Sequence, residues 1–150
     1  MNTIEPTISK TDANALITQW MDLWNGNLAI ADTIVSPDNR VHAAMMGGGD
    51  SSAVGGVEGM KAFVNGARAT AADLEFTVEV GPLVDGDHIV VRWLATGHYS
   101  GGFPGAAAPL GTEVAFHGID ILRISDGKIV EYWLNADTLD LVMQLQVGAA

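Results

Sequence analysis

The sequence predicts a single α+β domain in which a curved, mostly antiparallel sheet carries N-terminal helices on its concave face, as a cone-shaped α+β barrel. Helical spacing of apolar residues dominates the first half of the chain, and long alternating segments follow one another in the second half. Runs of helices followed by runs of strands are typical of α+β folds, and strands joined by tight turns are antiparallel. We expect one domain over residues 1–150, with residues 1–9 loosely held.

Three helices are predicted before the sheet. The first is capped by Thr11 or Asp12 and stops at Gly26, since these residue types favour helix ends. The second covers residues 28–35 and the third covers residues 58–67. Apolar side chains of the first helix recur at three- and four-residue spacing: Leu16, Ile17, Trp20, Met21, Leu23 and Trp24.

Five strands are predicted from alternating apolar and β-branched residues. They cover residues 40–45, 74–84, 88–98, 112–124 and 128–134. Asp85-Gly86-Asp87 and Asp126-Gly127 are typical hairpin turns between neighbouring strands. A glycine loop at 47–52, a Gly/Pro/Ala loop at 100–111 and a last helix near 137–146 complete the chain.

Composition excludes several classes of function. The chain has no cysteine, which rules out a thiolate zinc site and a cysteine nucleophile. Its net charge of −11 would repel nucleic acid. No His-x-x-x-His pair and no nucleotide-binding glycine loop occurs, so we expect neither a metal nor a cofactor. Without a leader peptide or a long apolar run, we expect a cytoplasmic protein with no membrane partner.

Four segments in the second half carry a resemblance to a known family. They are Gly97–Gly105, Phe116–Ile124, Asp126–Trp133, and Asp137 with Leu141 and Gln144-Leu145. In this order and spacing they resemble the SnoaL-like polyketide cyclase (ester cyclase) family, whose fold is the cone of the nuclear-transport-factor-2-like superfamily.

The resemblance implies cofactor-free chemistry on a hydrophobic carbonyl compound. In such cyclases a carboxylate removes a proton from a carbon between two carbonyls, and the enolate attacks a ketone of the same molecule. This chemistry requires a shaped apolar pocket, one general base and hydrogen-bond donors for the enolate. The resemblance also implies a homodimer formed through the outer face of the sheet.

The position of the catalytic acid differs from the family pattern. The family's acid/base aspartate lies at the end of the last strand, where Leu134 stands here with Asn135 and Asp137 nearby. The family's pocket histidine matches Asp120. We therefore expect Asp120 or Asp137 to be the base, with His98 as a polar helper.

Each of these residues has a second interpretation. Asp120 lies in an apolar strand, where a base would have a raised pKa, but it would alternatively be exposed or paired with Arg92. Asp137 is also a suitable helix cap, and His98 a partner for loop backbone. Strand alternation places His117 on the face opposite Asp120.

Further residues are candidates for substrate binding. Trp20 and Trp24 are expected to face or fill the cavity, and Met45 with Met46 to form an adaptable wall. The full set is Trp20, Trp24, His42, Met45, Arg92, Phe103, His117 and Trp133.

Two other functions remain open from the sequence. One is a non-catalytic small-molecule-binding domain on the same cone, which the displaced aspartate favours. The other is an epoxide hydrolase or isomerase-like enzyme, which uses carboxylates bridged by an arginine. Asp120 and Arg92 would form part of such a site, and an Arg92 that points away from Asp120 would remove this interpretation.

Overall fold

The computed structural model describes residues 7–45 and 49–149. The tail before residue 7, together with Met46, Gly47 and Gly48 of the expected wall and glycine loop, lies outside the described residues. The helical segments are α1 (Lys10–Trp24), η1 (Leu28–Ile30), α2 (Ala31–Ile34), α3 (Gly56–Arg68) and α4 (Thr138–Gln144). The strands are β1 (Val35–His42), β2 (Glu75–Asp85), β3 (His88–His98), β4 (Glu113–Ser125) and β5 (Lys128–Ala136).

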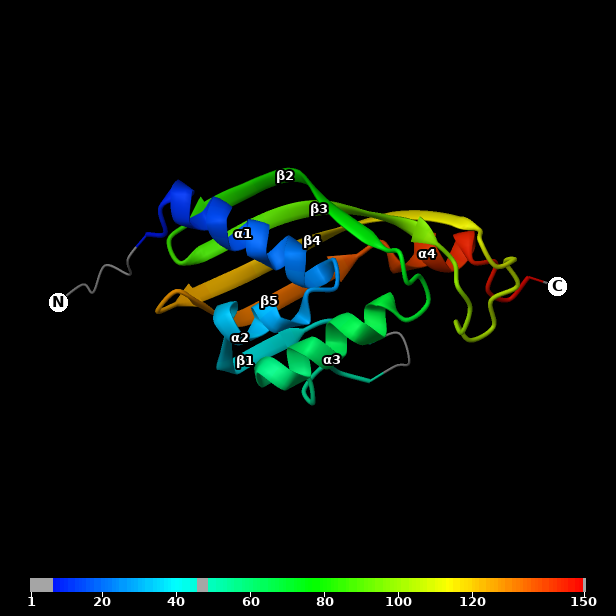
Figure 1. Ribbon diagram of the computed structural model, residues 1–150, viewed down its shortest axis with the longest axis horizontal. Helices are drawn as coiled ribbons and strands as arrows, with labels where there is room; N and C mark the ends of the chain where they lie inside the picture. Colours follow the sequence, from blue (N-terminus) through cyan, green and yellow to red (C-terminus); the bar gives the residue numbers. More distant parts are fainter. Residues whose placement is uncertain (1–6, 46–48, 150) are drawn as a thin grey trace.

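The strands form one sheet with the order β1-β5-β4-β3-β2. All neighbouring pairs are antiparallel except β1 and β5, which run parallel. Figure 1 shows the sheet curving behind α1, α2 and α3, with α4 beneath the right-hand end of β4. The predicted fold class is therefore confirmed, as a cone whose sheet does not close on itself. No helix in the described ranges is long and apolar enough to cross a membrane.

The first helices and strand differ from their predicted bounds. The cap of α1 is Ser9, whose Oγ accepts a hydrogen bond from the Asp12 amide at 3.0 Å. The predicted second helix is only a 3₁₀ turn followed by the four residues of α2. Its last residue, Val35, instead begins β1 and pairs with Ile129 of β5. Pairing with a buried strand outweighs helical spacing here.

The remaining elements lie within two residues of their predicted bounds, and those of β3 coincide with them. Strand alternation holds through β3 and β4 and sorts their side chains into two sets. The inner face, toward α1, carries buried residues such as Ile89, Val91, Trp93 and Leu122. The outer face carries polar, charged and half-buried apolar side chains.

Two polar clamps fix the end of α1 against the sheet. Asn25 exchanges hydrogen bonds with the backbone of Phe76, donating from Nδ2 at 3.2 Å and accepting at Oδ1 at 2.7 Å. The Arg68 guanidinium of α3 donates to the Trp24 carbonyl at 2.9 Å and also to the Leu74 carbonyl. These contacts hold the aromatic side chains of α1 over the inner face of the sheet.

Gly118 is required by a close approach inside the sheet. It pairs with Trp93 across β3 and β4, and the indole lies over the glycine. A Cβ on residue 118 would come within 2.1 Å of Trp93 Cζ2. The indole must therefore move if this position carries any side chain.

We predict that Gly118→Ala lowers the free energy of unfolding by about 1–3 kcal/mol, because overpacking displaces Trp93. The control is Gly66→Ala, since a Cβ at Gly66 of α3 meets no atom within 4 Å. That change should raise stability by about 0.5–1 kcal/mol through helix propensity. Urea denaturation measures both effects, and equal stabilities for the two variants would contradict the assigned packing.

Candidate functional site

Asp120 lies at the centre of the inner face and is the candidate functional residue. Its strand, β4, is paired on both sides, so the carboxyl group cannot reach solvent around a sheet edge. Asp120 is 1% exposed, and no other acidic or basic residue is buried in the part of the chain that the structure describes. Among these residues it also forms no ion pair. Of the orientations that the sequence left open for Asp120, the structure has the inward one.

Aromatic donors hold the carboxyl group. Trp20 Nε1 of α1 donates to Asp120 Oδ2 at 2.8 Å, and the Tyr132 hydroxyl of β5 donates to Oδ1 at 2.9 Å. The Trp20 and Tyr132 rings meet edge to face with their centroids 4.9 Å apart. One carboxylate thus joins the helical layer to the sheet through two hydrogen bonds.

Burial gives Asp120 an unusual acidity. Removal from water raises its pKa from 3.8 to about 6, because the charged form loses its solvation. Hydrogen bonds from Trp20, Trp93 and Tyr132 act in the opposite direction and keep the ionised form accessible. Burial also raises the pKa of Tyr132 well above its usual value, so this phenol stays a neutral donor. Asp120 is therefore able to exchange a proton near neutral pH.

Leu134, the position at which the resemblance implies an acid, lies directly beside Asp120. Leu134 of β5 is the cross-strand partner of Asp120 in β4. Side chains of directly opposed residues share one face, with their Cβ atoms about 4.5–5.5 Å apart. A carboxylate at residue 120 therefore occupies nearly the same region of the inner face as one at residue 134.

Arg92 does not contribute to this site, contrary to the predicted pairing with Asp120. Val91 is the partner of Asp120 in β3, so Arg92 projects from the opposite face. There its Nε donates to Glu79 Oε1 at 3.3 Å. The carboxylate–arginine arrangement expected for epoxide opening is absent from the described residues, and this interpretation is wrong.

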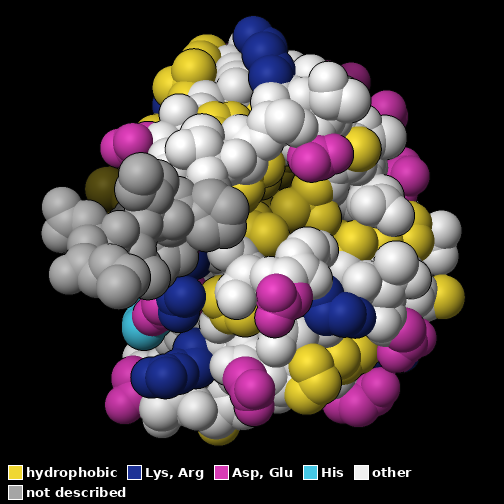
Figure 2. Space-filling model, turned by 90° about the vertical axis from the view of Figure 1, so that its left-hand side faces the viewer, with side chains coloured by type: hydrophobic (Ala, Val, Ile, Leu, Met, Phe, Trp, Pro, Cys, Tyr) yellow, Lys and Arg dark blue, Asp and Glu magenta, His cyan; other side chains and the backbone are white. Residues whose placement is uncertain are grey.

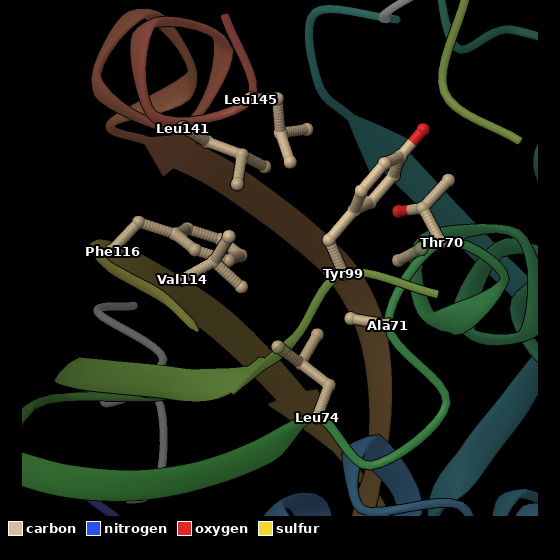
Figure 3. Close-up of a pocket in the computed structure, with 9 residues that line it drawn as sticks. Thr70, Ala71, Leu74, Tyr99, Val114, Phe116, Leu141 and Leu145 are labelled. Carbon is tan, nitrogen blue, oxygen red and sulfur yellow. The ribbon is translucent and has the colours of Figure 1, made fainter. Parts of the chain in front are cut away.

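A small cavity lies at the end of the cone beneath α4. Its internal volume is about 20 Å³, enough for about one water molecule. Figure 3 shows Leu141 of α4 and Leu145, which follows it, above the cavity, facing Val114 and Phe116 of β4, with Leu74 and Tyr99 on the other sides. These side chains belong partly to a second apolar cluster, in which the 100–111 loop packs on α4.

Two aromatic rings separate this cavity from Asp120. Along the inner face of β4 the residues between them are Phe116, which lines the cavity, and Gly118, which the Trp93 indole covers. The Phe116 and Trp93 rings meet edge to face at 5.8 Å. A ligand entering from this end must therefore displace them. Figure 2 shows that the opposite end, which carries the hairpin turns, is hollowed and floored by hydrophobic side chains.

Several predicted binding residues lie on the outer face instead. His117 is 3.3 Å from Glu79, on the face opposite Asp120 as strand alternation predicted. His42 Nε2 is 2.7 Å from Glu131, and the His42 ring stacks on Trp133 at 5.2 Å. His42 and Trp133 therefore do not line the interior as expected, because β1 and β5 turn these side chains outward.

Two tryptophans and a histidine among the remaining candidates lie in different parts of the molecule. Trp20 and Trp24 fill the interior as expected. His98 is exposed in an open groove of about 550 Å³, where its Nδ1 lies 2.6 Å from Asp73. Asp73 raises the pKa of His98, but the histidine lies on the face away from Asp120, so the two do not form a pair.

Other predicted residues lie farther along the chain. Asp137 is exposed at the start of α4, where its side chain makes no capping hydrogen bond. Phe103 is half-buried in the loop that packs on α4, and Met45 is half-buried just beyond β1. Of the two predicted acids, only Asp120 is inside the cone.

Sequence reasoning missed two residues of the site, Tyr132 and Trp93. Trp93 was detectable, because it alternates with Ile89 and Val91 on one face of a correctly bounded strand. Tyr132 could not be detected from the sequence. A register shift in the β4–β5 pair, next to Arg123, decides which face of the sheet its side chain is on.

The raised pKa of Asp120 predicts a specific dependence of stability on pH. Between about pH 4 and 6 the folded state keeps a proton that the unfolded state has lost. The contribution of Asp120 to stability therefore falls as pH rises through this window, in proportion to the extra proton held when folded. Asp120→Asn lacks this titration. Its free energy of unfolding, relative to that of the wild type, should therefore increase by about 2 kcal/mol from pH 4 to pH 7. Urea denaturation across this range is the measurement, and a constant difference would contradict the assignment.

Comparison with known proteins identifies the family. The family model described as SnoaL-like polyketide cyclase matches residues 14–145. TsrD from Streptomyces laurentii is 28% identical with a TM-score of 0.77, and the match covers 95% of this chain and 99% of TsrD.

Two more distant structures share the fold. IdmH from Streptomyces antibioticus is 24% identical with a TM-score of 0.76, covering 90% of this chain and 99% of IdmH. A SnoaL-like polyketide cyclase from Agrobacterium tumefaciens is 18% identical with a TM-score of 0.69, covering 89% and 97%. A comparison with curated proteins gives no match. The match of the family model over most of the chain shows that this protein belongs to the SnoaL-like polyketide cyclase family.

Proposed function

We propose that this protein is a cofactor-independent cyclase-like enzyme that removes a proton from a hydrophobic carbonyl compound, with Asp120 as the base. The observation that carries the proposal is the carboxyl group of Asp120, the only one buried among the described residues, with a pKa of about 6. A group with this pKa is largely ionised at neutral pH and returns a proton readily.

The place of Asp120 in the sheet supports the same role. The resemblance implies an acid where Leu134 stands here, and Leu134 is the cross-strand partner of Asp120. Transfer of the carboxylate from β5 to β4 keeps it on the same face and in the same part of the cone. Asp137 is exposed outside this interior, which makes it the weaker of the two predicted bases.

The proposed reaction has one proton-transfer step before ring closure. The C–H bond between two carbonyl groups breaks, its proton goes to Asp120, and the electron pair forms an enolate. The enolate carbon then attacks a ketone of the same molecule, and the resulting alkoxide takes the proton back from Asp120. The protein supplies a water-poor, aromatic interior in which a tethered chain is held ready to react.

The substrate must be admitted by movement of the protein. The described interior leaves about 20 Å³ next to Phe116, far less than a cyclase substrate occupies. The loop and α4 over this end are joined by a small cluster of apolar contacts, which costs less to open than the main core. We propose that the loop and α4 open to admit the substrate.

We also propose that the protein is a homodimer, because Ile119 and Leu83 leave apolar surface exposed.

Deuterium exchange tests proton removal without knowledge of the natural substrate. Ethyl 2-benzylacetoacetate has one proton between two carbonyls, and NMR follows its replacement by deuterium in D₂O. We predict protein-catalysed exchange that increases with pH and levels off above about 6, as Asp120 ionises. Asp120→Asn should reduce the catalysed rate by about 100-fold or more.

Two further variants control this experiment. Asp137→Asn should keep the wild-type exchange rate, because Asp137 lies outside the interior. Leu134→Asp added to Asp120→Asn should recover part of the rate by returning a carboxylate to the same region. Undiminished exchange in Asp120→Asn would exclude Asp120 as the base, and no exchange in any variant would favour a binding domain without catalysis.

A further inference from the structure

Trp24 carries an unpaired hydrogen-bond donor inside the cone. The residue is 4% exposed, yet its indole Nε1 has no acceptor among the described residues. A buried donor without a partner costs free energy that phenylalanine at the same position would avoid. Such a group in a folded interior calls for an explanation, and a missing ligand is one.

The contrast with Trp20 makes the unpaired group specific. Trp20 precedes Trp24 by one helical turn on the same face of α1, and its Nε1 is satisfied by Asp120. The two indoles pack edge to face with centroids 6.1 Å apart. Trp24 also packs with its ring centroid 6.4 Å from that of Tyr132, so it touches two of the aromatic donors of Asp120.

The position of Trp24 is fixed from several directions. Arg68 holds its carbonyl, and Asn25, the next residue, is bound to the backbone of β2. The Phe63 and Phe76 rings lie 5.8 and 5.2 Å from the indole. The donor is therefore preorganised in a water-poor environment, where a hydrogen bond to a ligand is stronger than in water.

We propose that Trp24 Nε1–H donates to the carbonyl oxygen of the bound substrate. This inference rests on the proposed function and assigns the contact that the substrate oxygen makes. Trp20 and Tyr132 are engaged with the carboxyl group of Asp120, which leaves Trp24 as the free indole donor of their aromatic cluster. When the C–H bond breaks and its proton goes to Asp120, the electron pair moves toward this oxygen. The same hydrogen bond then stabilises the enolate.

Indole NMR of the full-length protein tests the contact directly. The chain has four tryptophans and therefore four indole N–H signals, which single Trp→Phe variants assign. The probes are acetophenone and α-methylstyrene, which have similar shapes but differ in the oxygen acceptor. At saturation, acetophenone should shift the Trp24 indole proton downfield, and α-methylstyrene should not.

Binding to variants gives a second readout. Trp24→Phe should weaken acetophenone binding about tenfold, the usual contribution of one hydrogen bond, and leave α-methylstyrene binding within twofold. The matched control is Trp133→Phe on the outer face, which should bind both probes as the wild type does. If Trp24→Phe does not fold, the shifts of the Trp24 indole proton that the two probes cause in the wild-type protein still test the contact.

Three results would overturn the inference. They are equal Trp24 shifts with both probes, equal loss of affinity for both probes in Trp24→Phe, and no acetophenone binding at millimolar concentration. A Trp24 response without Asp120-dependent deuterium exchange would remove the proposed catalysis but keep the contact. Deuterium exchange that depends on Asp120, without any shift of the Trp24 indole proton, would exclude the Trp24 contact and keep the proposed catalysis.

Discussion

The burial of one carboxyl group between a helix and a sheet organises this protein. Asp120 joins α1 to β5 through Trp20 and Tyr132, so helix position, sheet register and site geometry depend on the same hydrogen bonds. Ionisation of Asp120 is unfavourable in this environment because the charge is removed from water. The hydrogen bonds from Trp20, Trp93 and Tyr132, however, stabilise the ionised form. The resulting pKa of about 6 is the compromise between desolvation and hydrogen bonding.

Aromatic packing gives the same interior its second property, the exclusion of water. Trp93 covers Gly118 and meets Phe116, so the carboxyl group is separated from the cavity under α4 by rings instead of by backbone. Side chains rotate more readily than strands separate. The main core is one large apolar cluster, while the loop and α4 at this end form a smaller one, which costs less to open.

Sequence reasoning succeeded where alternation is regular and failed where it is not. It gave the bounds of β3 and put Asp120 and His117 on opposite faces, because β4 alternates without interruption, but it left open which of the two faces inward. A regular hairpin counted from Ser125 and Lys128 would pair Leu122 with Glu131 and turn Tyr132 outward.

The observed shift next to Arg123 pairs Leu122 with Tyr132 instead, which brings the phenol to Asp120. The parallel pairing of β1 with β5, which turns His42 outward, is likewise a long-range contact that no local pattern encodes.

The most direct test of the account is an NMR titration of the Asp120 carboxyl carbon, whose signal is assigned by its absence in Asp120→Asn. We predict a midpoint near pH 6. A midpoint near 3.8, the ordinary value for aspartate, would contradict a buried carboxyl group poised for proton transfer.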